Sequence, residues 1–508
     1  RSGTSGDRWS QGEAKRALPY ERLRMSLFAP ICTDPASGAA GAMAVYSTAV
    51  ARIPAYQEFL REQGFDPETV RALEDFARIP VMTKKNYIGA YALNLRMING
   101  DINGAQIISS SSGSSGEPTF YARGPLSIAE SVELHRRILA GFNLGGGNTL
   151  IVVALAMGNW IGGTYTTEAA EKLSELGHRV VVVAPGVDKQ SVLATVKTLG
   201  PMFHNVVLVG YPPFLVDVVD EADDEILAQN IKLILAGEAI GEDRRDSLLS
   251  ALGKPGCVED ICVVYGTADA GMIGHETPSS IAIKRLALSH PALDEALFGG
   301  DAETSTFVEY DPNIRFIETE EDGHLLFTVE SSNLLRYRIN DVGAVWDGDE
   351  VRRIMAENGY QLEVATSTAG AGFVVLKRRS DVAVSFYAIN IYPEPIRASL
   401  ADPLLRGVLT GRFKIGRVPG AGMGSDTLGL DVEMRERIDP STGLDEDFAQ
   451  TVKEIVSDGL IRSNSEYREL LRQEGERVEP RITLHSFGSL PSRIGIRQPT
   501  IKDNEVQK

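Results

Sequence analysis

The stretch Thr149-Leu-Ile-Val-Val-Ala154 decides the fold, together with three similar stretches that follow it. These are Arg179-Val-Val-Val-Val-Ala184, Val206-Val-Leu-Val209 and Ile231-Lys-Leu-Ile-Leu-Ala236. Unbroken apolar runs of this length are typical of strands that are buried on both faces, as in a parallel sheet. Four such strands in series predict the centre of a large sheet.

Segments with helical spacing of apolar residues separate these strands, and a fifth apolar run, Ile261-Cys-Val-Val264, continues the series. A preceding helix is expected near Ser127, because Ser127 and Glu130 read as a capping box. Strands that alternate with helices predict an α/β fold with a mainly parallel sheet flanked by helices. The helices expected between the strands lie at 167–176, 190–199, 214–220 and 243–252.

The pattern changes in the second half of the chain. Short strands joined by acidic turns are expected at 325–329 and 344–346, and a second unit begins near Asp381. We therefore expect two domains, formed by residues 1–380 and 381–508. The elements expected in the second unit are strands at 382–387 and 428–434 and a helix at 445–460.

The composition excludes several classes of protein. The 508 residues carry a formal net charge of −18, which repels a phosphate backbone, so no nucleic-acid partner is expected. Cys32, Cys257 and Cys262 are too few for a disulfide framework, and we expect the last two to be core thiols. No apolar run reaches the length of a membrane span, about 18 residues. The first twenty residues lack the apolar segment of a secretory signal, so a cytoplasmic protein is expected.

The loop Ser109-Ser-Ser-Ser-Gly-Ser-Ser-Gly-Glu-Pro-Thr119 carries the first chemical signal. Glycines let a backbone approach a phosphate closely, and the freed N–H groups and hydroxyls can bind it. The loop lacks the Gly-Lys-Ser/Thr of a Walker motif. A flexible Ser/Gly linker is an equally good interpretation of this loop alone.

Two further motifs stand at the ends of predicted strands. Gly237-Glu238-Ala239 follows the fourth strand, and Tyr265-Gly-Thr-Ala-Asp269 follows the fifth. In open α/β sheets, ligands bind outside the carboxyl ends of the strands. The two motifs therefore favour a ligand site over a linker for the loop at 109–119.

Three later motifs complete the set: Arg336-Tyr-Arg-Ile-Asn-Asp-Val-Gly343, Arg378-Arg-Ser-Asp381 and Ile389-Asn-Ile-Tyr-Pro393. With them, the sequence resembles the adenylate-forming superfamily of acyl-CoA synthetases and peptide-synthetase adenylation domains. Within it, the sequence is similar to the phenylacetate–CoA ligase branch, of which Ile53-Pro-Ala-Tyr56 and Ile79-Pro-Val-Met-Thr-Lys84 are also typical. The resemblance extends over about residues 53–497 and is specific as a set of motifs.

The resemblance implies a large AMP-binding N-terminal domain and a small mobile α+β C-terminal domain that follows a hinge at Asp381. It implies an ATP-dependent ligase that joins an acid, expected to be an aryl acid, to AMP and then transfers it to a small nucleophile. ATP and Mg²⁺ are the implied cofactors, and whether coenzyme A is also used is left open. A homodimer is one option for the assembly.

The resemblance also assigns nucleotide-binding residues. Asp341 would bind the ribose hydroxyls, Arg379 would approach nucleotide oxygens, and Asp269 would take the place of the glutamate that binds magnesium. The triphosphate would lie against Ser112, Gly113, Ser114, Ser115, Gly116 and Thr119. The adenine pocket would be lined by Gly237, Glu238, Ala239, Tyr265, Gly266 and Thr267.

The acid pocket is implied for two segments that follow predicted strands. Trp160 and Tyr211 could stack on an aromatic acid, although ordinary core packing explains each equally well. His275 could face the same pocket, and a solvated loop histidine is the alternative. The residues implied for the substrate are Trp160, Gly162, Gly163, Tyr211, Pro212 and His275.

Three departures from the family pattern concern the chemistry. Glu117 stands where the phosphate loop usually has Lys, and Ala388 stands where a Gly lines the pantetheine tunnel. The catalytic Lys near the C-terminus is replaced by Ile496, for which Arg497 or Lys502 could substitute, although Lys and Arg differ in geometry. The catalytic set implied for this chain is Asp381, Arg379, Arg497 and Lys502.

These departures leave several functions open. The acceptor of the activated acid could be coenzyme A, giving a thioester, or an amine, giving an amide. A diazotase-like enzyme would instead activate nitrite for capture by an aromatic amine. A nucleotide-binding protein without catalytic activity is the remaining alternative. If the protein is an enzyme, we expect it to act in specialised biosynthesis.

Overall fold

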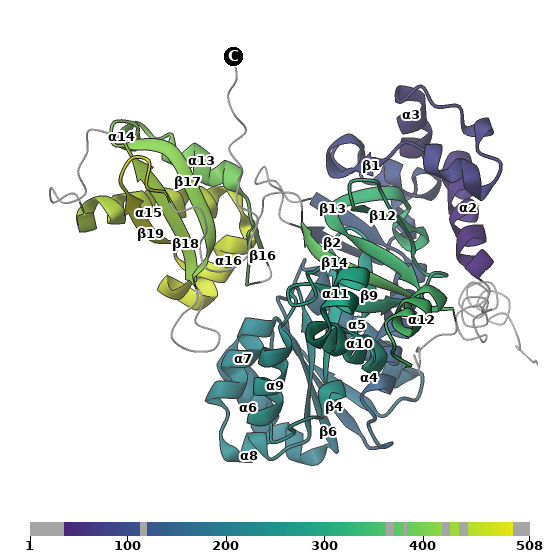
Figure 1. The fold of residues 1–508 in the computed structure, drawn as a ribbon, viewed down its shortest axis with the longest axis horizontal. Helices are drawn as coiled ribbons and strands as arrows, with labels where there is room; N and C mark the ends of the chain where they lie inside the picture. Colours follow the sequence, from purple (N-terminus) through teal and green to yellow (C-terminus); the bar gives the residue numbers. More distant parts are fainter. Residues whose placement is uncertain are drawn as a thin grey trace, which may run out of the picture.

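The computed structural model describes residues 35–111, 119–361, 370–379, 384–387, 389–418, 427–435 and 445–490. Most of the described chain before residue 380 surrounds one 12-stranded sheet. The residues from 384 onward form a smaller α+β unit, which Figure 1 shows as a separate body, with α16 turned toward the large one.

The first half of the large sheet is parallel, as the apolar runs predict. Its strands lie in the order β5-β4-β6-β7-β8 and pair in register, for example Ile151 with Val207 and Leu208 with Leu233. Leu150 and Val152 of β4 face one layer of helices, and the residues that alternate with them face the other. The strands are β4 (Thr149–Ala154), β5 (Val180–Val183), β6 (Asn205–Gly210), β7 (Ile231–Ala236) and β8 (Ile261–Thr267).

The second half of the sheet is antiparallel, which the apolar runs did not specify. From β8 onward the order is β9-β10-β14-β13-β12-β11, and the short strand β1 (Met82–Thr83) adds to β13 in parallel. The strands expected at 325–329 and 344–346 are confirmed within β12 and β13. The bounds are β9 (Gly271–His275), β10 (Thr306–Tyr310), β11 (Phe316–Thr319), β12 (His324–Val329), β13 (Leu334–Asp347) and β14 (Gly372–Arg379).

Helices cover both faces of the parallel half. α4 (Pro125–Gly141) and α5 (Ile161–Glu175) pack on one face, and α6 (Lys189–Leu199), α7 (Pro212–Glu221) and α9 (Glu242–Ala251) pack on the other. The remaining helices of the large unit are α2 (Pro35–Arg52), α3 (Pro54–Glu62), α8 (Asp224–Leu227), α10 (Pro278–Ser289), α11 (Pro291–Phe298) and α12 (Gly348–Glu357).

The expected capping box at Ser127 is wrong. α4 begins at Pro125 with Gly124 as its N-cap. The Ser127 hydroxyl contacts Tyr165 instead, and Glu130 forms an ion pair with Arg315 at 2.6 Å. Tertiary partners from distant parts of the chain therefore take both side chains away from the helix end.

The small unit packs α13 and α15 against a three-stranded sheet of order β17-β18-β19, and α16 packs against α15. β14 ends at Arg379 and the next described strand begins at Val384, so the domain boundary at 380/381 falls between them and stays a prediction. The elements are β15 (Val384–Phe386), β16 (Ile389–Ile391), α13 (Pro393–Leu400), α14 (Pro403–Arg406), β17 (Leu409–Val418), β18 (Thr427–Met434), α15 (Asp445–Ser463), α16 (Ser465–Glu474) and β19 (Arg481–His485).

Two further findings concern predictions about the whole chain. Cys262 is buried as expected, whereas Cys257 is exposed, so the prediction of two core thiols is wrong for Cys257. Among the described residues, no helix combines the length and the apolar character that crossing a membrane requires.

Candidate active site

The parallel half of the sheet gathers most of the predicted site residues at one edge. β4, β6, β7 and β8 run in the same direction, so their carboxyl ends meet there. The segments that follow these ends carry Trp160, Tyr211, Glu238 and Asp269. This is the edge at which open α/β sheets bind ligands.

Asp341 and Tyr265 contact each other directly at this edge. The Tyr265 hydroxyl donates to Oδ2 of Asp341 at 2.5 Å, and Asp341 is only 2% exposed. Asp341 lies opposite Arg379 in the pairing of β13 with β14, and Asn340 before it has a φ of 73°. Because asparagine tolerates this left-handed conformation, the strand can bend just before the carboxylate. Asp341 and Tyr265, both assigned to the nucleotide, therefore lie together. The backbone of Arg379, also assigned to the nucleotide, lies opposite Asp341.

Asp269 is held by two tyrosines. The Tyr337 hydroxyl donates to its Oδ2 at 2.5 Å, and Tyr121 also hydrogen-bonds to it. Burial, followed by the charge of Asp269, raises the pKa of Tyr121 far above its ordinary value, so this tyrosine stays a neutral donor. Arg96 and Arg123 attract the carboxylate from further away.

This arrangement fits a magnesium ligand. Carboxylate oxygens are the ligands that Mg²⁺ prefers, and among the described residues the carboxylate of Asp269 accepts hydrogen bonds from two neutral hydroxyls, while Arg123 donates to its backbone carbonyl at 3.2 Å. Tyr121 in turn lies 3.4 Å from the hydroxyl of Ser111, the last described residue before the loop at 112–118. The carboxylate is therefore linked by hydrogen bonds to the predicted phosphate loop.

Lys84, to which the sequence assigned no role, lies beside the predicted phosphate loop. Its Nζ donates to Oγ of Ser111 at 3.3 Å. The pairing of β1 with β13, Met82 with Tyr337, places Lys84 there, and Thr83 caps the helical turn that follows. In the sequence, the stretch that ends at Lys84 is only typical of the branch, and nothing near it indicates that Lys84 lies beside the predicted phosphate loop.

Replacing Lys84 with methionine should raise the KM for ATP about tenfold, since a hydrogen bond to a charged group contributes about 1.5–3 kcal/mol. The readout is the rate of pyrophosphate release as a function of ATP concentration. Lys85→Met is the matched control, because Lys85 is the adjacent, exposed lysine. Equal effects of the two substitutions would contradict a specific role of Lys84.

The Trp160 segment is fixed against the strand that leads into the phosphate loop. The amide of Ser110 in β2 (Ile107–Ser111) donates to the carbonyl of Asn159 at 2.9 Å. Gly163, in the first turn of α5, could not carry a side chain, because a Cβ would lie 2.4 Å from the carbonyl oxygen of Ala156. Gly163 thus permits close packing here, whereas a Cβ on the adjacent Gly162 would meet nothing closer than 3.4 Å. Thr119 begins the partner strand β3 (Thr119–Arg123), opposite Ser111.

Tyr211 and Pro212 begin α7 at the end of β6. The Tyr211 ring lies 5.8 Å from the ring of Tyr387 in the small unit, and its side chain is buried. The Tyr211 ring therefore packs against a protein side chain in this structure, with the two rings tilted by 36°.

The loop after β7 is tied to both units. Gly237 has a φ of 101°, a conformation that favours glycine, and Glu238 forms an ion pair with Arg417 of β17. Ala239 follows, and Thr267 closes the neighbouring turn after Gly266 by accepting a hydrogen bond from the amide of Ala270 at 3.0 Å. The residues assigned to adenine thus lie on adjacent strand ends.

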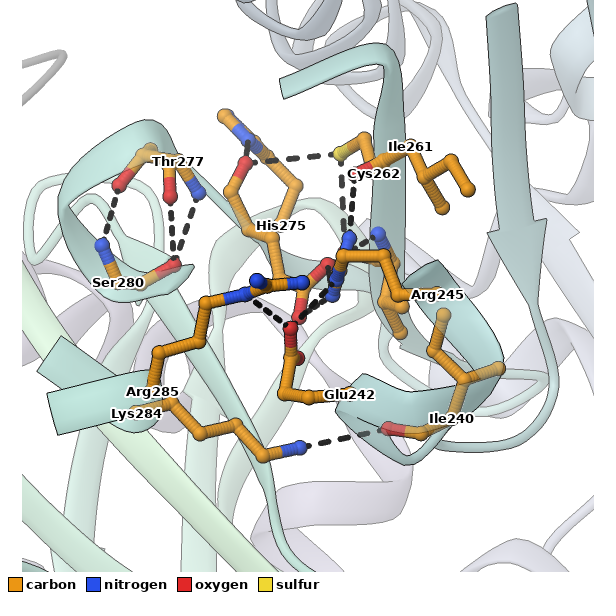
Figure 2. A network of polar contacts seen from close by, with 12 residues as sticks. Ile240, Glu242, Arg245, Ile261, Cys262, His275, Thr277, Ser280, Lys284 and Arg285 are labelled. Carbon is orange, nitrogen blue, oxygen red and sulfur yellow. Dashed lines mark hydrogen bonds and ion pairs between the residues drawn. The ribbon is translucent and has the colours of Figure 1, made fainter. Parts of the chain in front are cut away.

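A buried polar network contacts the same loop at Ile240 (Figure 2). Arg245 of α9 binds Glu242 at 2.9 Å, both oxygens of Glu276 at 2.7 and 2.8 Å, and the carbonyl of Ile261. Lys284 lies 3.4 Å from the carbonyl oxygen of Ile240, in the loop itself. The network fixes the start of α9, and it therefore also fixes the end of the loop after β7, to which the adenine pocket is assigned.

His275 does not lie with Trp160. It is buried and lines a separate pocket of about 290 Å³ with Arg136 and Cys262. Its Nδ1 lies 2.8 Å from the carbonyl oxygen of Glu276. Burial, partly opposed by this hydrogen bond, lowers the pKa of His275 to about 4.

The pKa of His275 gives a signed prediction for stability. The unfolded chain binds the proton near pH 6.5 and the folded chain near pH 4, so the contribution of His275 is complete above 6.5 and is lost as the pH falls toward 4. The loss amounts to about 3 kcal/mol at most. Urea unfolding across this range should show a smaller pH slope for His275→Gln than for the parent; identical slopes would contradict the assignment.

Several predicted residues lie outside the described part of the chain. Arg379 is described as the last residue of β14, without its side chain. The others are Ser112, Gly113, Ser114, Ser115, Gly116, Glu117, Asp381, Ala388, Ile496, Arg497 and Lys502.

Known structures share this architecture. The chain superposes on 2-hydroxyisobutyryl-CoA ligase in complex with 2-HIB-AMP and CoA with a TM-score of 0.57, at 18% identity over 93% of this chain and 90% of that one. The postadenylation state of the same ligase with R3-HIB-AMP gives a TM-score of 0.50, at 17% identity over 92% and 89%. No family model matches the sequence, and no curated protein matches it either. The chain therefore has the fold of the AMP-forming ligases.

Proposed function

We propose that the protein is an ATP-dependent, AMP-forming ligase that activates a carboxylic acid as an acyl-adenylate and transfers the acyl group to a nucleophile. The observation that carries the proposal is the convergence at one sheet edge of the Asp341–Tyr265 pair and the Asp269–Tyr337 pair, with Lys84 beside the phosphate loop. The shared fold with a ligase crystallised with acyl-AMP supports it.

Each residue has a defined task in this proposal. Asp341 accepts hydrogen bonds from the ribose hydroxyls, while Tyr265 holds its carboxylate in place. Lys84 binds phosphate oxygens as the charge on the leaving pyrophosphate develops. Asp269 would hold Mg²⁺, which neutralises phosphate charge when bound.

The first half-reaction follows from this arrangement. A carboxylate oxygen of the acid attacks the α-phosphorus of ATP, the bond to the β-phosphate oxygen breaks, and pyrophosphate leaves. The acid lies toward Trp160, because this segment is joined by its backbone to the strand that carries the phosphate loop.

The remaining expectations belong to the same proposal. They are the likeness to phenylacetate–CoA ligases, an aryl acid, a role in specialised biosynthesis, a cytoplasmic location and a domain boundary after residue 380. A homodimer is the proposed assembly, with small molecules as the partners and no nucleic acid or membrane.

The test is pyrophosphate and AMP release with Mg-ATP and a panel of aryl acids, amino-substituted aryl acids and nitrite, without coenzyme A. Release with a single carboxylic acid, and detection of the acyl-adenylate by mass spectrometry, is the expected result. Release only when nitrite is paired with an aryl amine would replace this function with N–N bond formation. ATP binding without turnover of any panel member would contradict the proposal.

A further inference from the structure

A cleft of about 810 Å³ lies between the two units. The large unit contributes the segments that follow β4 and β5, and the small unit contributes one face of α16. This volume is in the range of small-molecule sites, about 300–1,000 Å³. The cleft is on the same sheet edge as the candidate active site, because β4 and β5 run parallel to β6 and β7.

Negative charge predominates among the described residues that line the cleft. Asp188, Glu469 and Glu474 contribute carboxylates, and Lys189 contributes the single cation of that lining. The Lys189 ammonium itself forms an ion pair with Glu221 of α7, a residue outside the lining. Little of its charge is therefore available to an anionic ligand.

Two arginines outside the lining reduce its negative charge without reversing it, because the lining and its ion-pair partners together hold five carboxylates and three cations. Arg472 binds Glu469 at 2.6 Å, and Arg477 binds Asp217 at 2.6 Å and lies 3.8 Å from Glu474. Burial raises the pKa of Glu474 above its ordinary value, and Arg477 opposes this. A cation in the cleft would favour the charged form of Glu474, whereas a second anion would disfavour it.

The cleft also reaches the predicted acid pocket. Trp160 lines it, together with Met157 and Asn159 of the same segment. An indole face accepts both aromatic rings and cations, and an amide at its side can hydrogen-bond to a polar group. A molecule with an apolar body and a positively charged end matches this combination.

We infer that the nucleophile which enters through this cleft is an amine. The inference rests on the proposed acid adenylation and names its acceptor. The ammonium form is attracted to Glu469 and Glu474 and loses a proton to solvent, and the nitrogen lone pair then forms a bond to the acyl carbon. The bond from that carbon to the phosphate oxygen breaks and the nitrogen loses a second proton to solvent, so an amide forms and AMP leaves. Coenzyme A carries several phosphate charges, and the carboxylates of the cleft repel them.

In the test, the full chain is incubated with Mg-ATP, an acid that it adenylates, and either 2-phenylethylamine or coenzyme A. Mass spectrometry quantifies the amide and the thioester. Amide formation with a higher kcat/KM than thioester formation is expected. In the variant Glu469→Lys/Glu474→Lys, the KM for 2-phenylethylamine should rise about tenfold, while the KM for hydroxylamine, uncharged at neutral pH, should change less. Asp458→Lys is the control, since Asp458 is exposed on α15 and does not line the cleft.

Binding measurements separate this inference from the proposed function. Calorimetry with 2-phenylethylamine and with coenzyme A needs no adenylation, and the charge reversal should weaken only the amine. If the amine bound in a charge-dependent way but no pyrophosphate were released, the inference of an amine site would stand and the proposed ligase activity would be contradicted. Faster thioester than amide formation, or amine binding that the reversal leaves unchanged, would overturn the inference.

Discussion

Replacing Arg245 with methionine should lower the free energy of unfolding by about 3–5 kcal/mol, because it leaves the buried carboxylate of Glu276 without its ion-pair partner. The Arg245 side chain is fully buried, and Glu276 and Glu242 are 3% and 7% exposed. Glu276 also accepts a hydrogen bond from the amide of Val263 at 2.8 Å, so its carboxylate cannot turn toward solvent. Urea unfolding at neutral pH measures the loss.

The double variant Arg245→Met/Glu276→Gln should recover part of this stability, because it removes the charge of Glu276, the carboxylate that loses its ion-pair partner. Arg285→Met is the matched control. Arg285 also binds Glu242, at 2.7 Å, but its side chain is 30% exposed, so we expect less than half the loss. If Arg245→Met and Arg285→Met lost the same free energy of unfolding, burial of the ion pair would not be the cause of the loss.

Replacing Asp341 with asparagine should lower kcat/KM for ATP about 100- to 1,000-fold in the pyrophosphate assay. The reason is that two hydrogen bonds from ribose hydroxyls to a charged acceptor are weakened, each worth about 1.5–3 kcal/mol. The side chain keeps its size, so the contact with Tyr265 can persist. Calorimetry with ATP should show the same loss in affinity.

Asp347→Asn is the control for Asp341→Asn, at the far end of the same strand. Asp347 accepts a hydrogen bond from the amide of Glu350 at 2.7 Å as the N-cap of α12, and asparagine serves as well at such a position. Activity should therefore stay close to that of the parent. If Asp341→Asn kept full activity with unchanged ATP affinity, the assignment of the ribose site would be withdrawn.

The parallel half of the fold could be predicted because strands buried on both faces leave an unbroken apolar trace, as at 149–154. The antiparallel half could not, since its order depends on pairings between distant residues, such as Phe307 with Val375. The capping box at Ser127 was wrong because local spacing carries no information about Tyr165, a tertiary partner. Long-range contacts therefore limit what periodicity can predict.

The same distinction applies to the candidate site. Asp341 and Tyr265 were expected near one nucleotide from motifs alone, and the structure adds that they touch. The role of Lys84 could not be read from its own neighbourhood, because its position depends on the pairing of Met82 with Tyr337. The cleft beside α16 was equally invisible, since it needs the small unit to pack against the large one.

The ion pair between Glu238 and Arg417 has a thermodynamic consequence. Glu238 belongs to the loop assigned to adenine, and Arg417 belongs to the small unit. A nucleotide that strengthens or weakens this pair shifts the orientation of the small unit, and that orientation must change nucleotide affinity by the same factor. Domain rotation and nucleotide exchange are then governed by one coupling free energy, and because the side chains of the pair are only 18% and 10% exposed, salt should screen it little.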